Sequence, residues 1–292
     1  MHNTIKELET KANEIRKSVI EMLVEAGSGH SAGPLGMADV FTAFYFEILR
    51  HDPKNPSWPE RDRLVMSNGH INPVLYATMA HAGYFPIEEL KTLRKFGSRL
   101  QGHPHREFLP ALENSSGPLG LGLSQSVGMA LALRMDKGIS PRLGSGQTTD
   151  QYIYAFLSDG EQECGITWEG AMLAGKEKLH NLIAVIDRNN IQIDGFTEDI
   201  MPLEPLADKW RAFNWRVIEI DGHNMEEIVG AFNRAKSIFE KPTIIIAHTI
   251  PGKGVSFMEK KFEWHGKPPN KEEAVLALNE LRMIGDKIMN GK

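Results

Sequence analysis

The stretch YIYAFLSDGEQECGITWEGAMLAGKEKLHNLIAVIDRNNI, residues 152–191, decides the fold. Its apolar runs at 152–157 and 182–187 are each typical of a buried strand, and residues 166–178 between them have the pattern of a helix. A strand, a crossover helix and a second strand within about 30 residues form one parallel βαβ unit. The stretch therefore predicts an α/β protein built on a parallel sheet.

Polar residues follow both of these strands. Asp159 and Gly160 come after the first strand, and Asn189 comes after the second. Either half alone is more typical of an ordinary turn. Together they indicate a site, because open α/β sheets bind ligands at the carboxyl ends of parallel strands.

The oxygen atoms at these strand ends suit a hard cation. We predict a Mg²⁺ site formed by Asp159, Asn189 and the main chain of Ile191, with two diphosphate oxygens and one water completing six ligands. Gly160 has no Cβ and would let a phosphate approach the backbone. The helix that follows would present free N–H groups to the anion.

The rest of the chain continues the alternation of strands and helices, which favours a doubly wound parallel sheet flanked by helices. We expect one domain spanning residues 1–292, with a long functional loop at 97–118, an exposed turn at 144–150 and an irregular segment at 250–270. The predicted strands are 63–66, 152–157, 182–187, 216–220 and 243–248, and the predicted helices are 4–26, 37–49, 71–82, 86–96, 121–137, 166–178, 204–213, 225–239 and 271–289.

Composition excludes several classes of protein. The 292 residues are 41% hydrophobic and carry a net charge of −5, which gives no electrostatic argument for nucleic-acid binding. The single cysteine excludes an internal disulfide, and no apolar run approaches the roughly 18 residues of a membrane helix. The N-terminal residues mix acids and bases and do not form a secretory signal. We expect a soluble cytoplasmic protein.

The wider text resembles the transketolase family from about residue 15 to about residue 270. The Asp-Gly pair, followed by Asn about 30 residues later, is similar to the signature for thiamine diphosphate and magnesium. The resemblance implies these two cofactors and the thiamine diphosphate-binding fold. The other matching stretches are GSGHSAGPLGMADV (27–40), NPSWPERDRLVMSNGH (55–70), FGSRLQGHPH (96–105) and SSGPLGLGLSQSVGMALA (115–132).

Four histidines, His30, His70, His103 and His265, each lie beside a glycine in a predicted loop. Taken singly, each is more typical of a structural or solvated histidine. The resemblance implies instead that His70 lies nearest the diphosphate, and that His30, His103 and His265 are catalytic residues of the substrate channel. The structural or solvated interpretation is kept for His2, His51, His81, His180, His223 and His248.

The resemblance also implies contacts to the body of the cofactor. Gly117 and Leu119 would touch the aminopyrimidine ring, although a turn before a helix explains this motif equally well. Ile191 and Ile193 would pack against the middle of the cofactor, which is compatible with a place in the core of the sheet.

The sequence departs from the family at several positions. Cys164 stands where the family usually carries a glutamate that helps link two active sites across the subunit interface, and its thiol is typical of a small buried hydrophobe. Glu161 and Glu163 lie nearby, but Glu163 is not an automatic substitute, because one residue along a helix turns the side chain by about 100°. They are equally well explained as acidic residues at a helix start. Smaller departures are Ser158 for glycine, His105 for glutamate and GHSAGPLG for GHPGAPLG.

The chain matches only the diphosphate-binding part of a transketolase. By resemblance, the pyrimidine-binding half, with the glutamate that activates the cofactor and the groups that grip sugar phosphates, lies on a separate C-terminal subunit. The two would form a heterotetramer that moves a two-carbon ketol unit from a ketose phosphate to an aldose phosphate. Two alternatives are another thiamine diphosphate enzyme, such as a deoxyxylulose-phosphate synthase or a dehydrogenase E1 component, and a non-catalytic scaffold subunit.

Overall fold

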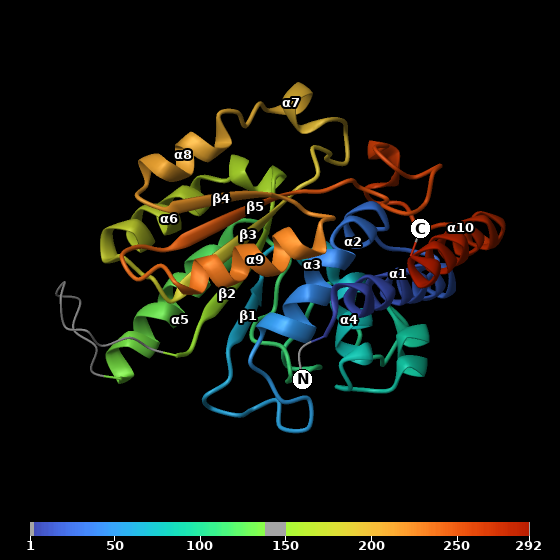
Figure 1. Ribbon diagram of the computed structural model, residues 1–292, viewed down its shortest axis with the longest axis horizontal. Coiled ribbons are helices and arrows are strands. Elements are labelled where there is room, and N and C mark those ends of the chain that lie inside the picture. The colour runs from blue at the N-terminus through green and yellow to red at the C-terminus, as the bar shows by residue number, and fades with distance from the viewer. Residues whose placement is uncertain (1–2, 138–149, 292) are drawn as a thin grey trace.

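Five parallel strands form the central sheet, in the order β1-β2-β3-β5-β4. The computed structural model describes residues 3–137 and 150–291, and all five strands lie within these ranges (Figure 1). The strand bounds agree with the predicted ones to within one residue. They are β1 (Arg63–Met66), β2 (Ile153–Ser158), β3 (Leu182–Arg188), β4 (Arg216–Asp221) and β5 (Thr243–His248).

Helices cover both faces of the sheet, as predicted for a doubly wound fold. Most lie close to their predicted positions. Their bounds are α1 (Ile5–Ala26), α2 (Ala32–Gly36), α3 (Ala38–Ala43), α4 (Asn72–His81), α5 (Leu121–Asp136), α6 (Gly165–Glu177), α7 (Thr197–Ile200), α8 (Leu206–Ala212), α9 (Met225–Lys236) and α10 (Lys271–Asn290).

Side chains that alternate along the strands build two separate cores. Tyr154 and Phe156 of β2 pack on one face with α1, α3, α4 and α9. Ile153, Ala155 and Leu157 of the same strand pack on the other face with α5, α6 and α8. Strands of a parallel sheet that is covered on both faces carry almost continuous apolar runs, which is why the sequence marked them so clearly.

Two predicted helices were wrong in detail. The expected helix at 37–49 is α3 followed by a π-helical turn, Phe44–Ile48. The expected helix at 86–96 is only a 3₁₀ turn, Ile87–Thr92, and the chain soon bends through Arg94 with a φ of 60°. The short helices α2 and α7 were not predicted, since segments this short depend on packing rather than on periodicity. Of the turn expected at 144–150, residues 144–149 lie outside the described residues.

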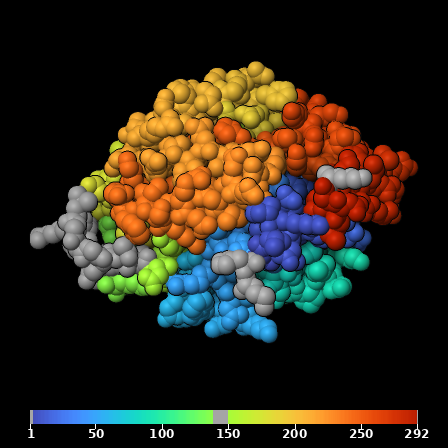
Figure 2. All heavy atoms as spheres, viewed as in Figure 1, coloured from blue at the N-terminus to red at the C-terminus, as the bar shows by residue number. Residues whose placement is uncertain are grey.

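The first and last helices lie side by side at one end of the molecule (Figures 1 and 2). The Lys6 Nζ group donates to the Met289 carbonyl oxygen at 2.8 Å, and the Asn13 amide donates to the Leu281 carbonyl oxygen at 2.9 Å. The α10 helix thus packs against the same helix that supports α3 and α4. Within the described ranges, no helix has the length and apolar content needed to cross a membrane.

A substitution at Gly175 of α6 tests how closely this helix packs against its neighbours. A Cβ added there would overlap the carbonyl oxygen of Phe213, an atom of the backbone. We expect Gly175→Ala to lower the free energy of unfolding by about 1–3 kcal/mol, because overpacking against a rigid backbone outweighs the better helix propensity of alanine. Urea denaturation of the purified variant measures this change.

Gly230 of α9 provides the matched control. A Cβ there meets only the end of the flexible Arg234 side chain, at 3.3 Å. Gly230→Ala should therefore leave stability unchanged or raise it by up to about 1 kcal/mol. Equal stability of the two variants would contradict the close approach of α6 to Phe213.

Candidate active site

One cavity of about 740 Å³ brings together every site residue that the sequence predicted. This volume lies within the range of roughly 300–1,000 Å³ that is typical of small-molecule sites. The predicted residues on its wall are His30, His70, His103, Gly117, Leu119, Asp159, Gly160, Asn189, Ile191, Ile193 and His265, and they are joined there by Ser158, Glu163, Cys164, Gln192 and Asp194.

Asp159 lies immediately after β2 and is almost completely buried, with 1% of its surface exposed. Its carboxylate accepts the Gly160 N–H at 2.8 Å and the Asn190 N–H at 2.7 Å. The Arg188 guanidinium, at the end of β3, donates to it at 3.2 Å. Burial nevertheless raises the pKa of Asp159 to about 6, because these partners only partly offset the loss of water. A cation beside this carboxylate would favour its charged form.

Asn189 is held in place by a second buried carboxylate, that of Asp187. The Asn189 amide nitrogen donates to Asp187 at 2.8 Å, and its amide oxygen accepts the Ile191 N–H at 3.0 Å. Burial and the nearby Asp159 carboxylate raise the pKa of Asp187 to about 7. Partners of this kind fix the orientation of a possible metal ligand.

The donor set at these strand ends fits Mg²⁺. Within residues 3–137 and 150–291, no group of three or more His, Cys, Asp or Glu is arranged to hold a metal ion. The predicted site is of a different kind, with one carboxylate at Asp159, one amide at Asn189 and one main-chain carbonyl at Ile191. Such hard oxygen ligands suit Mg²⁺ when a phosphate supplies further oxygens.

Arg188 ties the segment after β3 to the same place. Besides Asp159, its guanidinium contacts Glu198 at 2.6 Å and Glu204 at 3.0 Å. Only 2% of the Arg188 surface is exposed, whereas the side chains of Glu198 and Glu204 are 39% and 58% exposed. The arginine thereby fixes the segment that carries α7 against the ends of β2 and β3.

Three of the predicted histidines form a tight cluster across the cavity. The ring centroids are 5.1 Å apart for His30 and His70, 5.3 Å for His70 and His265, and 5.5 Å for His30 and His265. Burial is the main cause that lowers the pKa of each ring, to about 4 for His30. These imidazoles are therefore neutral near pH 7 and can both donate and accept hydrogen bonds.

Two nitrogen atoms of this cluster have no partner among the described residues. They are Nδ1 of His30 and Nδ1 of His265, and both are buried. Buried polar atoms are nearly always hydrogen-bonded in proteins, so these two unpaired nitrogen atoms are unusual. His103 lies on the same wall, and burial also lowers its pKa.

The loop before α5 contributes the apolar part of the wall. Gly117 has open space where a Cβ would lie, and Leu119 is 37% exposed. On the opposite loop Ile191 is buried, but Ile193 is 66% exposed. Its interpretation as a residue of the sheet core was therefore wrong, because the chain turns outward after Ile191 and leaves Ile193 on the cavity wall.

Glu161 and Glu163 have contacts that an acidic residue at a helix start does not require. Glu161 is fully buried, and its carboxylate is hydrogen-bonded on both oxygens. Glu163 is exposed at the cavity, where it accepts a hydrogen bond from Gln192. Cys164 is half-buried and also lines the cavity, so its expected place in the core was wrong. No pattern in the sequence distinguished these three neighbours, because the 3₁₀ turn Gly160–Glu163 sets their directions.

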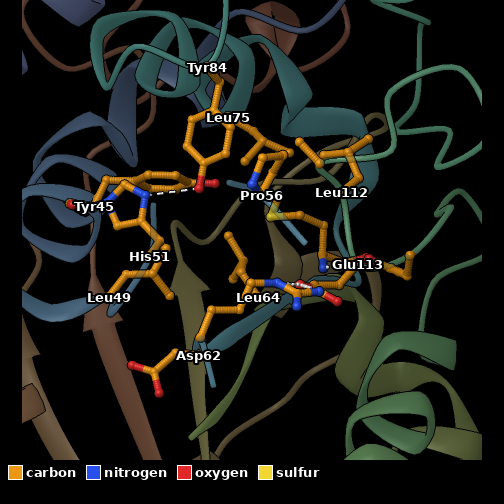
Figure 3. A pocket seen from close by; sticks show the side chains of 14 residues that line it. Tyr45, Leu49, His51, Pro56, Asp62, Leu64, Leu75, Tyr84, Leu112 and Glu113 are labelled. Atoms are coloured by element: carbon orange, nitrogen blue, oxygen red, sulfur yellow. Dashed lines mark hydrogen bonds and ion pairs between the residues drawn. The ribbon is translucent and has the colours of Figure 1, made fainter. Parts of the chain in front are cut away.

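A second, much smaller pocket lies apart from this site (Figure 3). Tyr84 and His51 stack there and share a hydrogen bond of 2.9 Å. Its volume of about 30 Å³ is room for about two water molecules. The structural interpretation of His51 fits this position, and that of His223 fits its contacts with Asp39 and the Ile250 N–H.

Comparison with known proteins identifies the class of this fold and site. Residues 8–285 match the family described as transketolase, thiamine diphosphate binding domain, and the chain belongs to this family. A transketolase structure from Campylobacter jejuni has a TM-score of 0.87 at 36% identity, and the match covers 96% of this chain and 43% of that one. One from Pichia stipitis has the same TM-score at 33% identity and covers 94% and 40%. The chain thus spans about two fifths of these full-length proteins.

Relatives of the same length are named as separate subunits. A 6-deoxy-6-sulfo-D-fructose transketolase subunit from a Clostridium species is 46% identical, covering 96% of this chain and 98% of the relative. A subunit of the apulose-4-phosphate transketolase of Phocaeicola vulgatus is 42% identical and covers 99% of each. The chain is an N-terminal transketolase subunit, and neither alternative considered for it is favoured.

The neutral state of His30 makes a prediction about pH. Its pKa is about 4 in the folded chain against an ordinary value of 6.5, so the unfolded chain binds more protons between these pH values. His30 therefore lowers stability as the pH falls from 6.5 towards 4. Between pH 7.5 and pH 5, the free energy of unfolding of His30→Gln should improve relative to the unchanged chain by about 2 kcal/mol.

Urea denaturation at both pH values measures this difference. The comparison must be relative, because Asp159, Glu161 and Asp187 have raised pKa values and stabilise the fold as the pH falls. His248→Gln, at the exposed end of β5, is the control for the loss of an imidazole. Parallel stability curves for His30→Gln and the unchanged chain would show that His30 is not buried as described.

Proposed function

We propose that this chain, together with a C-terminal subunit, transfers a two-carbon ketol unit from a ketose phosphate to an aldose phosphate. The main support for this proposal is that one cavity is lined by the oxygen donors at the strand ends, the histidine cluster and the GPLG loop. Thiamine diphosphate supplies the carbon nucleophile of the reaction when it is bound. Residues 1–292 act as a single cofactor-binding domain in this proposal, located in the cytoplasm.

Different residues of this chain would bind the metal ion, the diphosphate and the rings of the cofactor. Asp159, Asn189 and the main chain of Ile191 would hold Mg²⁺, and Gly160 would face the diphosphate. His70 lines the same cavity and would donate to a diphosphate oxygen. Gly117, Leu119 and Ile193 would contact the rings of the cofactor, which are flat and largely apolar.

The catalytic roles fall to the remaining histidines. His30, His103 and His265 would hydrogen-bond the sugar hydroxyls and move protons between them. Support comes from the pKa values of these three rings, which are lowered and keep them neutral at physiological pH. A neutral imidazole can accept a proton with one nitrogen while it donates with the other.

A partner subunit is needed to complete the cavity. Apolar side chains remain exposed around the site and along α5 and α6, where a partner would cover them. A two-plus-two heterotetramer would bury these surfaces in both halves. The exposed residues are Leu119, Leu121, Met135, Met172, Leu173, Ile193 and Phe196.

The substrate proposed here is an anionic ketose. One similar subunit is named for 6-deoxy-6-sulfo-D-fructose and another for apulose-4-phosphate, so both names specify a sugar with a negatively charged group. A ketose phosphate or a ketose sulfonate fits this pattern. Cys164 is the feature that would favour a non-catalytic scaffold, but the arrangement of the other site residues supports an enzyme.

The division between two subunits leads to the first test of this function. The purified chain alone should show negligible ketol transfer, because it lacks the half that completes the cavity. The complex with the C-terminal subunit should transfer the ketol unit in the presence of thiamine diphosphate and Mg²⁺. A coupled assay with a ketose phosphate and a ketose sulfonate as donors measures both. Rapid turnover by the chain alone would refute the split arrangement.

A second test concerns the cation. In the assembled complex, Asp159→Ala should weaken Mg²⁺-dependent retention of thiamine diphosphate by roughly a hundredfold or more, since even the outer partners of a metal site contribute 10–100-fold. Cofactor occupancy after gel filtration, with and without a chelator, provides the measurement. Asp199→Ala, at an exposed position on α7, is the control. Equal occupancy in Asp159→Ala and the control would remove Asp159 from the metal site.

A further inference from the structure

Glu161 is a buried carboxylate that joins three separate segments beneath the cavity. None of its surface is exposed, and it does not line the cavity itself. It lies in the 3₁₀ turn that follows Asp159, and this turn directs it away from the cavity and towards β1 and α5. Burying an unpaired carboxylate is costly, so a carboxylate at this position needs hydrogen-bond partners.

Both oxygens of this carboxylate accept hydrogen bonds. Oε1 accepts the Ser67 hydroxyl at 2.6 Å and the Gly120 N–H at 3.3 Å. Oε2 accepts the Ser158 N–H at 3.0 Å and lies 3.4 Å from the Ser158 hydroxyl. The residue therefore links the end of β1, the end of β2 and the start of α5, and its oxygens are already engaged within the protein.

The contacts at α5 replace an ordinary helix cap. Gly120, the residue before α5, has a φ of 86° and offers no side chain to cap the helix. Its N–H is bound by Glu161, and the Gly122 N–H is bound by the Ser67 hydroxyl at 3.1 Å. A negative charge at a helix N-terminus is favourable, and the first N–H groups of a helix need acceptors. Glu161 and Ser67 together supply them from outside the helix.

These contacts determine where the GPLG loop lies. Residues 117–120 run directly into α5, and Gly117 and Leu119 of this loop line the cavity. A Cβ on Gly122 would meet the Ser67 side chain and backbone, so the start of α5 is pressed against the end of β1. Asp159, two residues before Glu161, lines the same cavity.

We propose that Glu161 is a positioning residue that fixes the GPLG loop relative to the Asp159–Asn189 edge, so that the cavity is preformed for thiamine diphosphate. This inference rests on the proposed function of the cavity. Glu161 touches neither cofactor nor metal in this role. It acts through Gly120 and Ser67, and a preformed loop spares the cofactor the cost of ordering it.

The test uses the complex with the C-terminal subunit at pH 8 and compares Glu161→Gln with the unchanged enzyme. Glutamine keeps the shape but turns an NH₂ group towards donors that need an acceptor. Calorimetric titration with thiamine diphosphate in excess Mg²⁺ should show affinity reduced by roughly ten- to a hundredfold, the range expected for lost hydrogen bonds to a charged group. At saturating cofactor, kcat should stay within about twofold, since the catalytic groups are unchanged.

Two comparisons separate positioning from general support of the fold. Glu226→Gln, at an exposed position on α9, is the matched control and should bind the cofactor normally. Thermal unfolding without cofactor reports the contribution of Glu161 to stability alone. Unchanged cofactor affinity in Glu161→Gln, whatever its unfolding temperature, would overturn the proposal.

A second variant covers the case in which Glu161→Gln does not assemble. Ser67→Ala removes the hydroxyl that links Glu161 to Gly122 and should weaken cofactor binding by roughly three- to tenfold. In the double variant the two losses should not add, because both act through the same contact. Normal binding by Ser67→Ala would overturn the proposal. If the unchanged complex binds no thiamine diphosphate, the proposed function fails instead, independently of Glu161.

Discussion

The register between β2 and β3 is the constraint on which the site depends. Ser158, the last residue of β2, pairs with Asp187, and β3 continues for one more residue, so that Asp159 and Asn189 both follow at the same edge of the sheet. Because β2 is buried on both faces, a slip by one residue would exchange the side chains of the two cores and expose neither set to water. Packing of Tyr154 and Phe156 on one face and of Leu157 on the other therefore fixes the position of Asp159. The packing of the two cores therefore determines where the site residues lie.

Burial at this edge has an electrostatic cost that the fold only partly offsets. The carboxylates of Asp159 and Asp187 both have raised pKa values, and the Arg188 guanidinium compensates only one of them directly. On the other wall, neutral histidines leave two buried nitrogen atoms unpaired. Perturbed pKa values and unpaired buried groups of this kind are typical of functional sites. A divalent cation beside Asp159 would favour the charged form of its carboxylate and so offset part of this cost.

The sequence was informative wherever one local pattern determined the result. Continuous apolar runs marked β2 and β3, and the spacing from Asp159 to Asn189 indicated a shared edge. It did not predict the direction of side chains whose orientation depends on turns. Ile193 follows a left-handed residue, Asn190, and an isolated bridge between Ile191 and Phe196, which together carry it outward. Likewise, the inward turn of Glu161 depends on acceptors and donors from segments that are distant in sequence, which periodicity does not register.

Cys164, which stands where the family resemblance implies a glutamate, is held apart from the contacts of Asp159 and Asn189 by this same geometry. Cys164 precedes α6, whereas Asp159 is held by the backbone of its own turn, by Asn190 and by Arg188. Burial and the nearby Glu161 and Glu163 raise the pKa of the thiol, so it contributes no charge to the wall near neutral pH. The carboxylate of Glu161 accepts hydrogen bonds from Ser67 and Gly120, and that of Glu163 accepts one from Gln192, so both already have partners within the chain. The change therefore alters the cavity wall, while Asp159 and Asn189, the proposed cation ligands, keep their own contacts.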